Sequence, residues 1–202
     1  MRFSLELPVT EPGALGDCAA AIEAAGFDAC FVTDHPYPPR QWLEHGGHAT
    51  LDPFVALAYA AASTTELRLH THCSIPAYRN PYLAAKQIAT LDALSAGRVI
   101  LGVAAGYLEG EFAELGVDFS RRGALLDDAL VAMQDAWRGT TANVVEPRPV
   151  QQPRPPIWVG GNSAAAMRRA AQYDGWAPFP ASTRVAEATP PDQKTLPYTD
   201  AS

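Results

Sequence analysis

The chain has 202 residues, and its 22 aspartates and glutamates outnumber its 15 lysines and arginines, giving a formal net charge of −7. An acidic chain without basic clusters argues against nucleic acid and membrane surfaces as partners, and no apolar run reaches the 18 residues of a membrane-spanning helix. The three cysteines, Cys18, Cys30 and Cys73, form no CxxC pair, which favours a reduced, cytoplasmic compartment.

The first part of the chain predicts two strands around one helix. Alternating apolar residues predict a strand over 3–7, and an alanine-rich helix is expected over 14–25, with Gly26 in the C′ position. A second apolar strand is expected over 29–33. The prolines after it forbid a regular element, so we predict a long loop up to Thr50.

Two helices in the middle of the chain carry the same start signal. Asp52 and Asn80 are each followed by a proline, the pattern of an N-cap residue with proline at the first helical position. Between these helices, alternating apolar residues predict a third strand over 67–73. We expect the apolar face of the second helix to consist of Ala84, Ile88, Leu91 and Leu94.

The second half begins with an uninterrupted apolar run over 99–103, which is typical of a strand buried on both faces of a parallel sheet. A loop with three glutamates follows, and then a helix over 121–137 with Ser120 as its expected N-cap. A polar, proline-rich connection leads to a fifth strand over 157–159. A short alanine-rich helix and a sixth strand over 174–177 complete the pattern.

The strict alternation of strands and helices indicates an α/β fold with a parallel sheet and right-handed crossovers. Periodicity alone leaves open whether this sheet is doubly wound or forms a barrel. After Pro180 the chain has no further apolar run. We therefore expect one domain over 1–180 and a loosely ordered tail over 181–202.

Seven short segments carry a resemblance to a known family. They are 33–35, 52–57, 78–81, 91–98, 98–123, 159–163 and 174–176. In this order they resemble the luciferase-like monooxygenase superfamily, and within it the deazaflavin-dependent (coenzyme F420) oxidoreductases. The resemblance implies a (β/α)8 barrel of the TIM-barrel type, here with about six strands and the last two βα units missing. It also implies hydride transfer between F420 and a small organic substrate, with an FMN-dependent monooxygenase as the alternative.

Active sites of such barrels lie at the carboxyl ends of the strands. Asp34 and His35 end the second strand, and the resemblance puts this histidine near the reactive carbon of the cofactor ring. Imidazole can move a proton near neutral pH, so we predict His35 as the catalytic residue and Asp34 as a cofactor-binding one. The plain alternative is a loop histidine capped by Asp34.

Three other strand ends are expected to bind the cofactor. The residues are His72, Cys73 and Ser74 after the third strand; Ala104, Ala105 and Gly106 after the fourth; and Gly160, Gly161, Asn162 and Ala165 after the fifth. The resemblance implies a non-proline cis bond in the first set, the flavin ring and ribityl chain near the second, and the cofactor phosphate at the third. The glycine turn and helix start suit a phosphate on physical grounds as well. An ordinary tight turn with Asn162 as N-cap is the alternative.

Several features limit the function. His45 and His48 have no carboxylate or thiolate close by in the sequence, so we predict no metal site. Tyr107 follows Gly106, whereas F420-dependent glucose-6-phosphate dehydrogenases carry a glutamate there, which argues against the same sugar-phosphate oxidation. A six-stranded remnant also has two open edges, so we expect a homo-oligomer or a marginally stable chain. A non-catalytic homologue that binds a flavin-like ligand, or nothing, is the remaining alternative.

Overall fold

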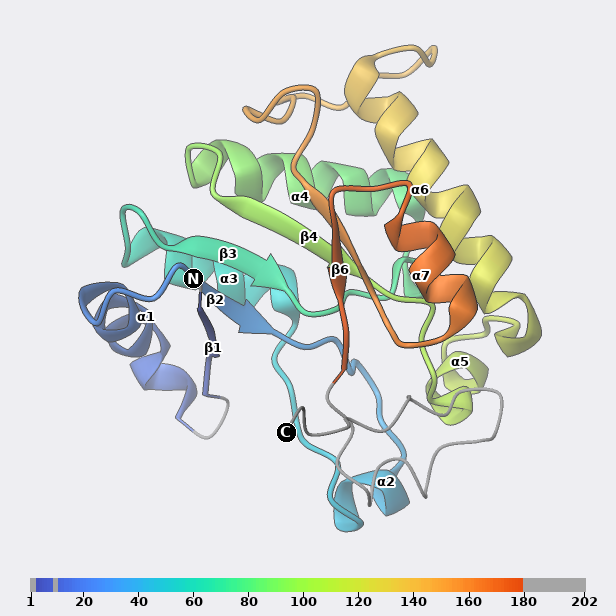
Figure 1. The fold of residues 1–202 in the computed structure, drawn as a ribbon, viewed down its shortest axis with the longest axis horizontal. Coiled ribbons are helices and arrows are strands. Elements are labelled where there is room, and N and C mark those ends of the chain that lie inside the picture. The colour runs from blue at the N-terminus through green and yellow to red at the C-terminus, as the bar shows by residue number, and fades with distance from the viewer. Residues whose placement is uncertain (1–2, 9–10, 180–202) are drawn as a thin grey trace, which may run out of the picture.

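The computed structural model describes residues 3–8 and 11–179, so the tail expected over 181–202 lies outside the described residues. Its sheet has six parallel strands in the order of the chain (Figure 1). They are β1 (Ser4–Glu6), β2 (Ala29–Val32), β3 (Arg68–Thr71), β4 (Val99–Val103), β5 (Ile157–Gly160) and β6 (Gly175–Ala177). Because the order never reverses, right-handed crossovers place successive helices on the same face of the sheet. The sheet is therefore a curled, incomplete TIM-type barrel rather than a doubly wound sheet.

Seven α-helices accompany the strands in the described part of the chain. They are α1 (Leu15–Ala24), α2 (Arg40–Glu44), α3 (Pro53–Ala62), α4 (Pro81–Leu94), α5 (Glu109–Glu114), α6 (Arg122–Arg138) and α7 (Ala164–Ala170). The long helices pack in series, α1 on α3, α3 on α4 and α4 on α6, while α2 is set apart from the sheet (Figure 1). Among the described residues, none of these helices is long and apolar enough to cross a membrane.

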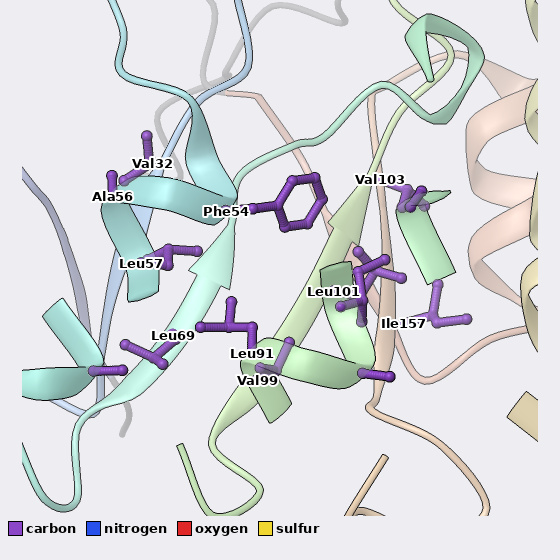
Figure 2. Packing of buried hydrophobic residues seen from close by; sticks show 14 of the residues in the cluster. Val32, Phe54, Ala56, Leu57, Leu69, Leu91, Val99, Leu101, Val103 and Ile157 are labelled. Carbon is purple, nitrogen blue, oxygen red and sulfur yellow. The ribbon is translucent and has the colours of Figure 1, made fainter. Parts of the chain in front are cut away.

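The main core lies between the strands and these helices. Figure 2 shows Leu57 of α3 and Leu91 of α4 beside Leu69, Leu101 and Ile157 of the sheet, and all five are nearly inaccessible to solvent. Each such side chain contributes roughly 1.5–3 kcal/mol when it is removed from water. The apolar strand pattern therefore holds the helices on the outer face of the sheet.

The predicted helix starts are confirmed. The Asp52 side chain accepts hydrogen bonds from the backbone N–H groups of Phe54 and Val55, both at 3.0 Å. The Asn80 side chain accepts the N–H of Tyr82 at 3.0 Å in the same way. An Asn or Asp cap stabilises a helix by about 1 kcal/mol, so α3 and α4 begin where local sequence directs them to begin.

Two expectations about the helix starts after β2 and β4 are wrong. The loop up to Thr50 contains the short helix α2. A proline disrupts a helix when it lies in the helix interior, whereas Pro39 precedes the first helical turn. The start before α6 is capped by Asp118, which accepts the N–H of Ser120 at 2.9 Å, so Ser120 is not the cap. Asp118 begins a short 3-10 turn that precedes the helix.

One inference from periodicity about side-chain exposure is also wrong. Leu94 is 73% exposed. An α-helix has 3.6 residues per turn, so Leu94 lies to one side of the stripe formed by Ala84, Ile88 and Leu91. His70 of β3 is 3% exposed. Its ring packs against those of Phe31 in β2 and Trp158 in β5, with 6.5 and 5.1 Å between centroids, so β3 is buried on both faces.

Over the described residues, β1 and β6 are the edge strands of the sheet. Phe3, Leu5 and Trp176 lie at these edges, and each is more than 40% exposed. The expected apolar surface at the open side is therefore present.

Candidate active site

His35 follows β2, and both of its ring nitrogens have partners. Nδ1 lies 3.2 Å from Oε2 of Glu111, and Nε2 lies 3.3 Å from the hydroxyl oxygen of Tyr107. The ring of Trp42 on α2 packs against the imidazole with 4.6 Å between centroids. The His35 side chain is only 10% exposed. Segments after β2 and β4 thus enclose one imidazole at the carboxyl end of the sheet.

Glu111 is buried in α5, with 1% of its surface exposed. Its Oε1 accepts the backbone N–H of Tyr37 at 3.2 Å, and its Oε2 accepts the hydroxyl of Tyr78 at 3.1 Å. A carboxylate can only accept hydrogen bonds, and Glu111 accepts from all of its other partners. Its contact with His35 therefore assigns a proton to Nδ1 of the imidazole. In the neutral imidazole, Nε2 is then an acceptor that faces Tyr107.

Both tyrosines of this network hold their protons at neutral pH. Burial raises the pKa of Tyr107 to about 12, and the negative charge of Glu111 acts in the same direction. Burial, followed by Glu111, also raises the pKa of Tyr78. The network therefore presents phenol groups rather than phenolates to a ligand.

A second histidine supports the wall around His35. His48 lies with Nε2 at 3.1 Å from the hydroxyl oxygen of Thr33, and its ring is 5.4 Å from those of His35 and Trp42. Burial lowers the pKa of His48, and the neighbouring His35 lowers it further. His48 is thus favoured in the neutral form and adds little positive charge beside His35.

Asp34 is placed differently from its neighbour. Its carboxylate is 3% exposed and receives two hydrogen bonds from Arg79, at 2.6 and 2.9 Å. The N–H of Ile75 donates to the same group at 2.9 Å. This buried pair joins the ends of β2 and β3, and the predicted contact of Asp34 with a cofactor stays a prediction.

The cis bond expected after β3 is confirmed at His72-Cys73. The chain then rejoins the sheet, because the N–H of Ser74 donates to Gly102 O and the N–H of Ala104 donates to Ser74 O, both at 2.9 Å. Burial raises the pKa of the Cys73 thiol to about 12, so this cysteine is not a thiolate nucleophile at neutral pH.

Small residues end β4. Ala104 is buried and Ala105 half-buried, and Gly106 has φ +86°, in the region that favours glycine. A Cβ on Gly106 would lie 2.7 Å from the ring of Phe112. Phe112 follows Glu111 in α5, so the close packing of Phe112 against Gly106 also helps to hold the Glu111 carboxylate next to His35.

The residues at the turn after β5 make different contacts. A Cβ on Gly160 would lie 2.4 Å from Cys73 Sγ, so this glycine is required by packing against the end of β3. Gly161 has φ +110°, and a Cβ there would meet only Ala166, at 3.3 Å. The side chain of Asn162 bonds the backbone N–H and C=O of Phe179, at 3.2 and 2.8 Å.

The expected alternative of Asn162 as N-cap is therefore wrong. Ser163 caps α7 and accepts the N–H of Ala166 at 3.1 Å, because Asn162 is already bonded to the segment after β6. Ala165 lies in the first turn, where helix N–H groups have no partner within the helix. The N–H of Gly161 already donates to Ala177 O at 3.2 Å, so an anion at this turn depends on the N–H groups at the start of α7.

The structure joins the predicted strand ends of β2 to β5 into one rim through these contacts. It adds four side chains that sequence reasoning does not assign to the site: Glu111, Tyr78, Trp42 and Tyr107. In the sequence, Tyr107 stands out only as a departure from related enzymes. Glu111 is one of three glutamates in its loop, and no local pattern distinguishes it from Glu109 and Glu114, which are exposed.

Known proteins are similar to this chain in sequence. A sequence model of the family described as luciferase-like monooxygenase matches residues 3–194. An uncharacterized protein of Mycobacterium tuberculosis (strain H37Rv) is 33% identical over 213 residues, covering 93% of this chain and 75% of the relative. An F420-dependent glucose-6-phosphate dehydrogenase of Mycobacterium avium (strain 104) is 38% identical over 141 residues, covering 63% of this chain and 38% of the relative.

Among solved structures, the monooxygenase RslO1 from Streptomyces bottropensis is similar. Its TM-score is 0.72 with 26% sequence identity, and the match covers 85% of this chain and 57% of that structure. The chain therefore spans little more than half of that monooxygenase and less than half of the dehydrogenase.

Proposed function

The chain belongs to the luciferase-like monooxygenase family, and from this premise we propose that it is an oxidoreductase that uses F420 on a small organic substrate. The cofactor, when bound, supplies or accepts the hydride. The observation that carries the proposal is the hydrogen-bonded series Glu111, His35 and Tyr107 at the carboxyl end of the sheet. The F420-dependent relative from Mycobacterium avium supports this choice of cofactor.

The residues around the rim fit a flavin-type cofactor. A Cβ built on Gly161 would contact only Ala166, so the space beside this glycine is open. We propose that a phosphate approaches the backbone here, including the N–H of Ala165. Ala104 and Ala105 are proposed to lie beside the ring and ribityl chain of the cofactor, because their small side chains permit a close approach at the end of β4. The remaining residues proposed to contact the cofactor are His72, Cys73, Ser74, Gly106, Gly160 and Asn162, with Asp34 supporting them through Arg79 and Ile75.

His35 is proposed to move a proton during turnover. Glu111 fixes the ring by accepting from Nδ1, so only Nε2 can exchange a proton toward the ligand side. Trp42 and Tyr107 flank the ring and restrict water around it. An imidazole whose other nitrogen is held by a carboxylate suits a group that accepts and returns a proton.

A parallel titration with F420 and FMN tests the cofactor assignment. We expect F420 to bind the wild-type chain, and Gly161→Val to weaken binding about tenfold while the circular dichroism spectrum stays unchanged. Gly26→Val is the matched control, because Gly26 also has positive φ and nothing within 4 Å of the position that a Cβ would take, but lies at the end of α1. Equal F420 binding by folded Gly161→Val would count against the phosphate site.

An FMN-dependent monooxygenase is the second candidate, favoured by the structural similarity to the monooxygenase RslO1. Tighter binding of FMN than of F420, together with NAD(P)H-driven O₂ uptake, would support it. Binding of either chromophore without turnover would favour a non-catalytic homologue.

The exposed sheet edges support self-association of the chain. Phe3, Leu5 and Trp176 provide apolar surface beside the unpaired edges of β1 and β6 in the described part of the chain, and such surface on a stable monomer is uncommon. We expect light scattering to report more than one copy. A compact monomer with a sharp unfolding transition would contradict this expectation.

A further inference from the structure

The series of hydrogen bonds around His35 has one end that reaches solvent. Glu111 is 1% exposed and the His35 side chain 10% exposed, whereas Tyr107 is 40% exposed. Both nitrogens of His35 are occupied, and its ring is covered by Trp42 and His48 at 4.6 and 5.4 Å. Of these three residues, Tyr107 is therefore the one that a ligand approaching from solvent meets first.

The series can exist in two protonation states with the same heavy-atom positions. In the first, Nδ1–H of His35 donates to Glu111, and the Tyr107 hydroxyl donates to the lone pair of Nε2. In the second, His35 carries a proton on both nitrogens, Nε2–H donates to the Tyr107 oxygen, and the hydroxyl proton points away from the ring. The buried carboxylate of Glu111 stabilises the positive ring of the second state.

We propose that Tyr107 is the catalytic residue that exchanges a proton with the substrate, and that His35 acts through it. This inference rests on the proposed function and makes it more specific. The phenol is the group in contact with the substrate oxygen, His35 replaces or removes its proton, and Glu111 is a positioning residue for the ring.

A relay that ends on the hydroxyl of Tyr107 fits a substrate that gains or loses its proton on oxygen, as a carbonyl compound and its alcohol do. In the reducing direction, reduced F420, when bound, would supply the hydride to the carbonyl carbon, and the carbonyl oxygen would take the hydroxyl proton of Tyr107. Tyr107 takes the Nε2 proton of doubly protonated His35, which returns the series to its first state. Oxidation of the alcohol runs through the same transfers in reverse, so the chain gains or loses one proton for each hydride.

The chemistry of Tyr107 agrees with this assignment. Its pKa of about 12 keeps the phenol protonated, so it donates without bringing negative charge next to a carbonyl oxygen. A relay between oxygen and nitrogen atoms serves a substrate that is protonated on oxygen. No charge on the substrate is required for this contact.

Tyr107→Phe tests the inference, because it keeps the ring and removes the hydroxyl. We expect kcat for F420-coupled oxidation of 2-propanol and reduction of acetone to fall about 10²–10³-fold, with F420 affinity unchanged within about twofold. Tyr59→Phe is the matched control, since Tyr59 is an exposed tyrosine on α3 outside the site, and it should keep wild-type values. Retention of more than half of the wild-type kcat by Tyr107→Phe would overturn the inference.

A second measurement does not depend on turnover. ¹⁵N spectra of the histidine side chains should show a change at Nε2 of His35 in Tyr107→Phe and none in Tyr59→Phe. An unchanged Nε2 resonance would overturn the relay even if activity fell. If the wild type neither binds F420 nor turns over, the proposed function fails, and these spectra still decide whether Tyr107 and His35 share a hydrogen bond.

Discussion

His35 and His70 belong to neighbouring strand segments of one sheet but differ in their hydrogen bonding. His35 lies just beyond the end of β2, and each of its nitrogens has a partner. His70 lies within β3, packed against Trp158 with 5.1 Å between ring centroids, and its Nε2 has no partner among the described residues. Burial lowers the pKa of His70 to about 3, with His72 and Arg68 adding to the effect.

This difference shows how the position along a strand decides what a histidine can do. Inside the sheet, backbone groups of neighbouring strands are already bonded to each other and apolar rings fill the space, so an imidazole stays neutral. Beyond the strand end, loops from other βα units supply a carboxylate and a hydroxyl. Only the second environment provides a route for a proton.

The largest effect is expected from His35→Ala. It removes the group between Glu111 and Tyr107, so turnover should fall by about 10²–10⁴-fold, while the dissociation constant of F420 changes little. Steady-state kinetics and a binding titration measure the two effects separately. His45→Ala is the control, because His45 is exposed and its side chain bonds only the carbonyl of Gln41 among the described residues. Full activity of folded His35→Ala would assign His35 a structural role.

A smaller effect is expected from Glu111→Gln. The amide keeps the shape of the carboxylate but lacks its charge, so it no longer favours a proton on both nitrogens of His35. We expect kcat to fall about 10–100-fold. This is the range found when a hydrogen-bond partner that orients a metal-binding histidine is removed, and Glu111 orients His35 in the same way. The kcat–pH profile should also change, which a loss of stability alone would not produce.

Glu114→Gln provides the comparison for this variant. Glu114 lies on the same helix, α5, but is exposed. Its replacement should leave both kcat and the pH profile as in the wild type. Equal losses in the two variants would mean that the net charge of α5, and not the bond to His35, is responsible.

The smallest effect is expected from His70→Phe, and it concerns stability. The folded pKa of His70, about 3, lies below the ordinary 6.5, so the unfolded chain binds a proton that the folded chain rejects. Stability is therefore lost as the pH falls from 6.5 toward 3, by about 2 kcal/mol at pH 5 for this group. His70→Phe should lose correspondingly less between pH 7 and 5 in urea unfolding, with kcat nearly unchanged at neutral pH. An identical pH slope in the two proteins would contradict the burial of a neutral His70.

Local sequence determined most of the secondary structure. The uninterrupted apolar run of β4 and the caps Asp52 and Asn80 appear where the pattern predicts them, because each depends on residues within a few positions of itself. The resemblance of short segments to the family also predicted the cis bond at His72-Cys73 and the barrel-type fold. Of these features, the apolar run and the caps are encoded by neighbours along the chain, whereas the cis bond and the fold were inferred from the resemblance alone.

Tertiary structure decided which side chains meet. Glu111 lies 76 residues from His35, and Arg79 lies 45 residues from Asp34, so neither pair leaves a trace in local periodicity. The rings of neighbouring strands buried His70, and the packing of Phe112 against Gly106 selected Glu111 from three glutamates of one loop. Sequence patterns specify which face of an element is apolar, but a hydrogen bond between strand ends requires the whole sheet to assemble, because its two partners are brought together only by the strands between them.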